Sequence, residues 1–189
     1  MKTLKLFGLL IAGACVVQAC SSPENRTVDT DTSISTTTMT ESTTGAGMDS
    51  TVSNFMTKAA IGGMMEVEAG KLAEKSANPK VKAFGEEMVK DHTKANDELK
   101  ALANKKQVSV PMMLPSEENA HLDAMKKMKG ADFDKHYVEM MVTDHDKTIA
   151  LFKTAANSTD VDVKDFANKT IPVITGHFEQ AKSIQNGMK

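Results

Sequence analysis

The chain has 189 residues, which suits one domain with appendages, because a domain usually takes about 100–200 residues. Its composition favours helix, with 14 Met, no Trp, one Tyr and only 5 Pro. The net charge of −2 and the lack of a basic run argue against nucleic acid as a partner.

Residues 1–19 have the pattern of a secretory signal peptide. Two lysines precede an apolar run over residues 6–17, which is too short for a comfortable membrane span. The letters VVQA before Cys20 resemble a bacterial lipoprotein signal, and this resemblance implies cleavage before Cys20 and acylation of that residue. Cys15 is the rival lipidation site, and an ordinary secreted protein is the alternative interpretation. We expect a lipid-anchored protein of the bacterial cell envelope, at the outer membrane.

Residues 20–50 are predicted to be a disordered spacer that begins at the lipidated cysteine. Fifteen of the thirty positions in 21–50 are Ser or Thr, and almost none is a large apolar residue. Such a segment cannot bury enough surface to offset the entropy lost on ordering. The spacer would separate the lipid from a folded domain over residues 51–189.

The folded domain is predicted to be all-α. Apolar residues recur at intervals of three and four, which is typical of amphipathic helices. We expect long helices over 51–77, 79–106, 131–157 and 162–186, and a short helix that Ser116 caps and Gly130 ends. The connection 107–130 is long enough to return the chain along a helix of about 39 Å. The sequence therefore predicts a ferritin-like four-helix bundle with a crossover connection that contains the short helix.

The second and third long helices share a repeated phrase. Residues 84–100 align with residues 137–153 at an offset of 53, and seven of the seventeen aligned positions are identical. Each copy contains an Asp-His pair, which is Asp91-His92 in the first and Asp144-His145 in the second. Each Asp lies about 100° around the helix from its His, so it could orient an imidazole on a neighbouring helix or bind an ion directly.

One polar residue interrupts the apolar face of each long helix, and these residues are Glu66, His92, His145 and His177. Each lies within about 4.5 Å of the midpoint of its helix along the axis. Helix midpoints meet at one level in a bundle, so we expect the four side chains to converge in the interior. An unpaired carboxylate there is costly, and buried imidazoles need partners.

Two interpretations of this convergence stay open. Three imidazoles and one carboxylate form a ligand set for one transition-metal ion, with iron, zinc and copper as candidates. The same four residues could instead be a buried hydrogen-bond network without metal, and methionines near this level are more often core residues than ligands.

The signature of di-iron bundles is missing. Those sites take a Glu-x-x-His pair from each of two helices. Here the only such spacing joins Glu118 to His121 in the short crossover helix, without a second copy. We therefore expect a site for one ion rather than two, and we do not assign His121 to it.

Several stretches of the domain resemble the bacterial family called domain of unknown function 4142. They are Phe55-x₃-Ala59-x₃-Gly63-x₂-Glu66-Val67, Gly70-Lys71-Leu72-Ala73, Val81-Lys82-x-Phe84, Met88-Val89-x-Asp91-His92-Thr93-Lys94, Phe133-Asp134-x-x-Tyr137, His145, Leu151-Phe152, and Pro172 followed by His177. The resemblance covers about residues 52–186 and implies a ferritin-like bundle on secreted, often envelope-associated proteins. It supplies no catalytic role.

Two functional hypotheses follow from these observations. The first is an envelope lipoprotein whose bundle binds one transition-metal ion through Glu66, His92, His145 and His177, for metal handling or stress protection. The second is a non-enzymatic structural or interaction lipoprotein without metal. No nucleophile elbow, phosphate loop or other catalytic motif supports an enzyme. The expected partner is a membrane, through the lipid; protein partners are not predicted, and a homo-oligomer stays open.

Overall fold

The computed structural model of the chain describes residues 50–188. The predicted signal peptide, Cys20, Cys15 and nearly all of the predicted spacer lie outside the described residues. Within residues 50–188 every regular element is a helix, as the sequence predicts. The helices are α1 (Ser50–Ala73), α2 (Pro79–Lys105), α3 (Ser116–Met125), α4 (Gly130–Ala155) and α5 (Val161–Asn186).

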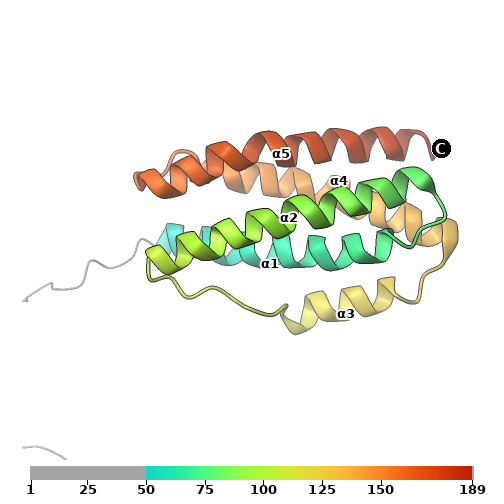
Figure 1. Cartoon of the computed structure of the whole chain (residues 1–189), viewed down its shortest axis with the longest axis horizontal. Helices are drawn as coiled ribbons and strands as arrows, with labels where there is room; N and C mark the ends of the chain where they lie inside the picture. Colours follow the sequence, from blue (N-terminus) through green and yellow to red (C-terminus); the bar gives the residue numbers. More distant parts are fainter. Residues whose placement is uncertain (1–49, 189) are drawn as a thin grey trace, which may run out of the picture. The chain divides into compact units, whose positions relative to one another are not determined.

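Four long helices form the bundle, and α3 lies against its side (Figure 1). Helix α1 packs against α2 and α4, and α5 packs against α4 and α2. Neighbours run antiparallel: Phe55, early in α1, meets Phe152 near the end of α4 with ring centroids 5.0 Å apart. Lys105 at the end of α2 contacts Asp162 at the start of α5.

The crossover carries the chain from the end of α2 back to the start of α4, so that α2 and α4 run in the same direction (Figure 1). This path confirms the prediction of a ferritin-like bundle with one crossover and a short extra helix. Helix α3 contacts α1 and α4. Its first residue is Ser116, and no side chain caps it, so the capping predicted for Ser116 is wrong. Gly130, at a φ of 52°, begins α4 instead of ending α3.

Helix α1 ends at Ala73, earlier than the predicted position 77, because of the turn that follows it. Asn78 caps α2, with its side-chain oxygen accepting a hydrogen bond from the backbone N–H of Lys80. Pro79 occupies the first turn of α2 and disfavours helical geometry in the preceding residue. The junction is also fixed by Ser76, whose hydroxyl donates to Asp134 on α4 at 2.6 Å.

Two glycines let α1 and α2 approach closely. A Cβ on Gly85 would lie 2.9 Å from the carbonyl oxygen of Gly70 and 2.8 Å from the Cβ of Ala73. A Cβ on Gly70 would lie 3.0 Å from the carbonyl oxygen of Gly85. Backbone therefore packs directly on backbone here, and these contacts fix the register of the two helices one to two turns from the bundle midpoint.

The core of the bundle consists of two apolar clusters, one toward each end. One contains the aromatic side chains Phe55, Phe152 and Phe166, and the other is rich in methionine, including Met88 and Met141. The buried polar side chains between them belong to Glu66, His92, His145 and His177. The polar layer predicted at mid-height therefore lies inside the bundle.

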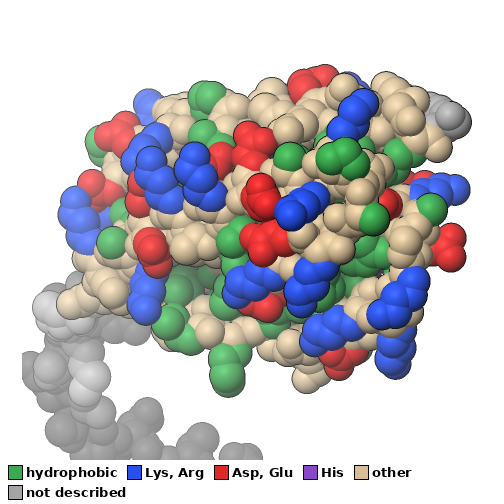
Figure 2. Space-filling model, turned by 45° about the vertical axis from the view of Figure 1, so that its right-hand side comes forward, with side chains coloured by type: hydrophobic (Ala, Val, Ile, Leu, Met, Phe, Trp, Pro, Cys, Tyr) green, Lys and Arg blue, Asp and Glu red, His purple; other side chains and the backbone are tan. Residues whose placement is uncertain are grey.

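Charged side chains of both signs lie on the face shown in Figure 2, with Lys and Arg side chains among Asp and Glu side chains. No helix within residues 50–188 is long and apolar enough to span a bilayer.

Candidate metal centre

Four side chains from four helices meet in the interior at the boundary between the two apolar clusters. Glu66 comes from α1, His92 from α2, His145 from α4 and His177 from α5. Their exposed fractions are 4 %, 5 %, 0 % and 2 %. The imidazole rings face one another, with centroids 5.5 Å apart for His92 and His145, 5.2 Å for His92 and His177, and 5.6 Å for His145 and His177.

Glu66 binds two of the imidazoles from one side. Its Oε2 lies 3.0 Å from Nδ1 of His92, and its Oε1 lies 3.5 Å from Nδ1 of His145. Nδ1 of His145 also lies 3.0 Å from the carbonyl oxygen of Met141, to which an Nδ1–H donates. The carboxylate and the carbonyl thus hold the proton of His145 on Nδ1 and leave Nε2 with a free lone pair.

Asp91 holds the third imidazole. Its Oδ2 lies 3.2 Å from Nε2 of His177, so that Nδ1 is the free nitrogen of that ring. Asp91 lies on α2 and His177 lies on α5. Asp91 therefore orients an imidazole on a neighbouring helix, as the sequence predicted for the aspartates of the repeat. Asp144, its counterpart in the repeat, makes no such contact. Its carboxylate is partly exposed and lies 3.4 Å from Nζ of Lys147.

Three ring nitrogens are left buried without a hydrogen-bond partner among the described residues. They are Nε2 of His92, Nε2 of His145 and Nδ1 of His177. The three histidines each offer a ring nitrogen, and these atoms lie within 4.8 Å of one another. Unpartnered buried polar atoms are rare in folded proteins, so three together need an explanation. Three convergent lone pairs suit one transition-metal ion, and carboxylates on the opposite nitrogens are the usual support of metal-binding histidines.

Burial and the carboxylate of Glu66 shift the pKa values of the three histidines in different directions. Burial lowers the pKa of His145 to about 4, and burial also lowers the pKa of His177. Burial acts in the same direction on His92, but the carboxylate of Glu66 outweighs it and raises the pKa of His92. Burial would raise the pKa of Glu66, yet His92 and the other imidazoles outweigh it and lower that pKa. Glu66 and His92 therefore favour each other's charged forms, whereas burial favours the neutral forms of His145 and His177, and an ion bound at Nε2 of His92 would require the neutral form of that ring.

A second group of possible ligands leads from the cluster toward the surface. Glu87 is exposed, Asp91 is partly exposed and His177 is buried, and their ligand atoms lie within 4.8 Å of one another. His177 belongs to both groups, with Nε2 facing Asp91 and Nδ1 unpartnered. His177 therefore connects the buried cluster to two carboxylates nearer the surface. Glu87 was not singled out from the sequence, where it is one of several charged residues in its stretch, although it lies one helical turn before Asp91.

Two further features of the site lie outside what the sequence predicted. A small cavity of about 30 Å³, lined in part by Glu66 and His92, has room for about one water molecule. Asn96 lines this cavity, and its side-chain amide occupies the space that a Cβ on Gly63 would need. Tyr137 is fully buried, and its hydroxyl has no partner among the described residues. The sequence signals for it were its place in the Phe133-Asp134-x-x-Tyr137 stretch and its position two turns before His145.

Glu118 and His121, the isolated Glu-x-x-His spacing, lie on α3, outside the four long helices. His121 contacts His136 of α4, with the two Nε2 atoms 2.9 Å apart. The fold therefore separates the five histidines into a buried cluster of three and a pair at the α3–α4 contact.

Comparison with solved structures supports the fold. A fragment described as DUF305 from Deinococcus radiodurans superposes with a TM-score of 0.63 at 9 % identity, covering 72 % of this chain and 95 % of that fragment. The similarity at this identity is one of fold. A search among curated proteins finds no match. The sequence profile of the family described as "Domain of unknown function (DUF4142)" matches residues 37–184. The chain, with its bundle and its buried histidines at the resembling positions, therefore belongs to the DUF4142 family.

Proposed function

We propose that the bundle binds one transition-metal ion through Nε2 of His92, Nε2 of His145 and Nδ1 of His177. Two observations support this most directly: each buried histidine has an unpartnered ring nitrogen, and one ring nitrogen from each histidine lies within 4.8 Å of the others. Three imidazoles with a fourth position free are a known ligand set for zinc, and imidazole also suits copper and iron.

Glu66 has a different role here from the one expected from the sequence. Both of its oxygens are directed at Nδ1 atoms, 3.0 Å from His92 and 3.5 Å from His145. It would therefore orient two ligands and offset the charge of the ion rather than bind the ion first, as Asp91 would do for His177. Such partners raise the basicity of the ligand nitrogen and fix the ring before the ion arrives.

Metal content tests this function. Tag-free protein purified without chelator should contain one equivalent of iron, zinc or copper, measured by elemental mass spectrometry. The variants His92→Ala and His145→Ala should each lose that equivalent while circular dichroism shows their helix content retained. Metal well below one equivalent in the wild type, unchanged by either substitution and by added zinc or copper, would reject the metal site.

The rival hypothesis is a hydrogen-bond network without metal, and the short Glu66–His92 contact is the observation that favours it. The two hypotheses differ in thermal stability. An ion that binds only the native state must raise the melting temperature. At an ion concentration one hundred times its Kd, the unfolding free energy rises by about 2.7 kcal/mol. A network without metal predicts one melting temperature with zinc, with copper and with chelator.

We also propose that Cys20 carries a lipid that anchors the protein to the cell envelope, where the bundle would handle metal or protect against stress. The motivating feature is the lipoprotein-like sequence before Cys20. Mass spectrometry of the mature protein from a bacterial host should show a diacylglyceryl mass on Cys20. Cys20→Ser should abolish it, and Cys15→Ser is the matched control because Cys15 would leave with the signal. The reverse pattern assigns the lipid to Cys15.

A further inference from the structure

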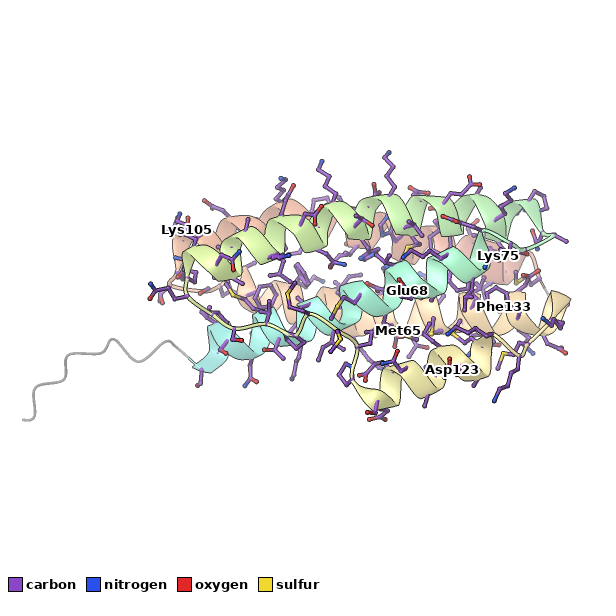
Figure 3. The ribbon with its side chains drawn as sticks, turned by 60° about the horizontal axis from the view of Figure 1, so that its bottom comes forward. Met65, Glu68, Lys75, Lys105, Asp123 and Phe133 are labelled. Atoms are coloured by element: carbon purple, nitrogen blue, oxygen red, sulfur yellow. The ribbon has the colours of Figure 1, made fainter. Side chains whose placement is uncertain are left out.

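The α3–α4 contact contains a second pair of histidines that the central cluster does not use. His121 comes from the crossover helix and His136 from the second turn of α4. Figure 3 shows α3, where Asp123 is labelled, beside the first part of α4, where Phe133 is labelled. Both imidazoles are partly buried, so solvent and small ions can reach them.

The two imidazoles approach each other through one nitrogen each. The Nε2 atoms lie 2.9 Å apart, and the ring planes make an angle of 74° with centroids 5.2 Å apart. Two nitrogens bound to one ion at about 2.05 Å would be about 2.9 Å apart if they subtended 90°, and about 3.3 Å apart in a tetrahedral site. A separation of 2.9 Å is also that of a hydrogen bond. As ligands, the two nitrogens would need least movement to take adjacent positions of a square-planar or tetragonal site, which Cu²⁺ and Ni²⁺ prefer.

A carboxylate lies one turn from the pair. Glu118 precedes His121 by three residues, which places the two side chains on one face of α3. The Oε2 atom of Glu118 is buried and has no hydrogen-bond partner among the described residues. Glu118 is therefore a carboxylate of α3 placed to reach an ion bound at His121. By contrast Asp123, two residues after His121, lies about 200° around the helix from it and pairs with Lys126 at the surface.

We propose that His121 and His136 form a second metal site, selective for a divalent ion with square-planar or tetragonal preference such as Cu²⁺, with Glu118 as a third ligand. In the free protein the 2.9 Å contact is one hydrogen bond, which requires the donor ring to carry its proton on Nε2. Binding moves that proton to Nδ1 of the same ring, and both rings stay neutral. The bound ion would join α3 to α4 and so secure the crossover. This proposal does not depend on the central cluster.

The test is a titration of the full-length, tag-free protein with Cu²⁺, followed by electron paramagnetic resonance. The wild type should bind one more Cu²⁺ than either His121→Asn or His136→Asn. The signal of that ion should show coupling to two imidazole nitrogens and disappear in both variants. Glu118→Gln should weaken the binding of this Cu²⁺ at least tenfold, whereas Asp123→Asn, the matched control on the opposite side of α3, should leave its affinity unchanged.

Equal Cu²⁺ stoichiometry and identical spectra in the wild type, His121→Asn and His136→Asn would overturn the proposal and leave the pair as a hydrogen bond. An effect of Asp123→Asn as large as that of Glu118→Gln would overturn the assignment of the third ligand. Circular dichroism of each variant establishes that the helices persist, because all four residues lie at the outer side of the bundle. The central site is followed separately in His145→Ala, which should keep the two-imidazole Cu²⁺ signal.

Discussion

The two groups of histidines differ in what holds each ring before an ion arrives. In the buried cluster the carboxylates of Glu66 and Asp91 lie against the outer nitrogens of all three rings, and the inner nitrogens are left free. In the pair at the α3–α4 contact, each imidazole has only the other as its hydrogen-bonding partner among the contacts described. The cluster is therefore preorganised by the fold, whereas the pair is organised by one contact.

Burial gives the two groups of histidines different effects on the free energy of unfolding. A polar group in the interior has lost its water, so a missing partner costs more there than in a partly exposed place. The carboxylates of the cluster thus serve the folded state as well as any ion. For the pair, solvent can replace the lost contact. Substitutions should consequently affect stability strongly in the cluster and weakly in the pair.

Removing the carboxylate of Glu66 should have the largest effect. Glu66→Ala leaves Nδ1 of His92 without its partner in the core and removes the counter-charge of that imidazole, which we expect to cost about 3–5 kcal/mol of unfolding free energy. Denaturant unfolding in the presence of chelator measures this. The matched control is Glu68→Ala, two residues on, where an exposed carboxylate pairs with Lys71 and the cost should stay below about 1 kcal/mol.

Equal stability losses in Glu66→Ala and Glu68→Ala would show that the buried pair contributes nothing beyond a surface pair. Zinc or copper content of the same two variants separates orientation from stability. We expect Glu66→Ala to lose metal and Glu68→Ala to keep it, since of these two residues Glu66 is the one that contacts the ligand rings.

The stability of the metal-free protein should depend on pH through the cluster. The pKa of His145 is about 4 in the fold against about 6.5 in the unfolded chain, so its contribution is complete above pH 6.5 and declines as the pH falls toward 4. Between pH 6.5 and 5 the loss should be about 2 kcal/mol. The raised pKa of His92 has the opposite effect on stability. The stability that His92 contributes is present below pH 6.5 and is lost as the pH rises through the pKa of His92 in the folded protein.

Unfolding free energies measured with chelator should therefore be highest near pH 6.5. His145→Asn should reduce the decline between pH 6.5 and 5 and leave the part that the lowered pKa of His177 causes, while His136→Asn should preserve the whole decline. A decline that is the same in both variants would assign the acid sensitivity to groups outside the buried cluster.

Asp91 should have an intermediate effect, and the sequence repeat supplies its control. Asp91→Asn weakens the hydrogen bond that fixes His177, which should lower metal affinity about 10–100-fold, as outer partners of metal ligands usually do. Asp144 occupies the equivalent repeat position but pairs only with Lys147, so Asp144→Asn should leave affinity unchanged. Competition with a chromophoric zinc chelator measures both, and similar affinities in the two variants would contradict the assignment of Asp91.

Helical periodicity was sufficient to predict the fold and the inward direction of the four polar residues. A face of a helix is a property of local spacing, so Glu66 and the histidines were placed correctly toward the interior. The two repeat aspartates show where this reasoning ends. Asp91 and Asp144 occupy equivalent positions of the repeat, each just before a histidine, but only Asp91 contacts a histidine of another helix among the described residues.

The features that the sequence did not predict all depend on contacts between helices. Which nitrogen of each ring is free follows from the position of Glu66 and Asp91, not from the helix that carries the ring. His121 and His136 lie fifteen residues apart on two helices, and their contact exists only because α3 folds back onto α4. The end of α3 was misplaced for a related reason: Gly130 suits a helix end, but the chain uses its positive φ to begin α4.

The smallest effect is expected at the pair in the absence of metal. His136→Asn removes one partly buried hydrogen bond, which should cost about 0.5–1.5 kcal/mol of unfolding free energy in chelator. Hydrogen exchange should show faster exchange confined to α3, because α3 is attached to the bundle by few contacts, whereas Glu66→Ala should accelerate exchange in all four long helices. With saturating Cu²⁺ the difference between wild type and His136→Asn should grow, since the ion stabilises only the protein that retains both imidazoles. Two outcomes would contradict this prediction: a stability loss as large as that of Glu66→Ala, or a difference between wild type and His136→Asn that Cu²⁺ leaves unchanged. Either would mean that the pair is a structural contact like those of the buried cluster. The distinction between a site preorganised by the fold and a pair organised by one contact would then fail.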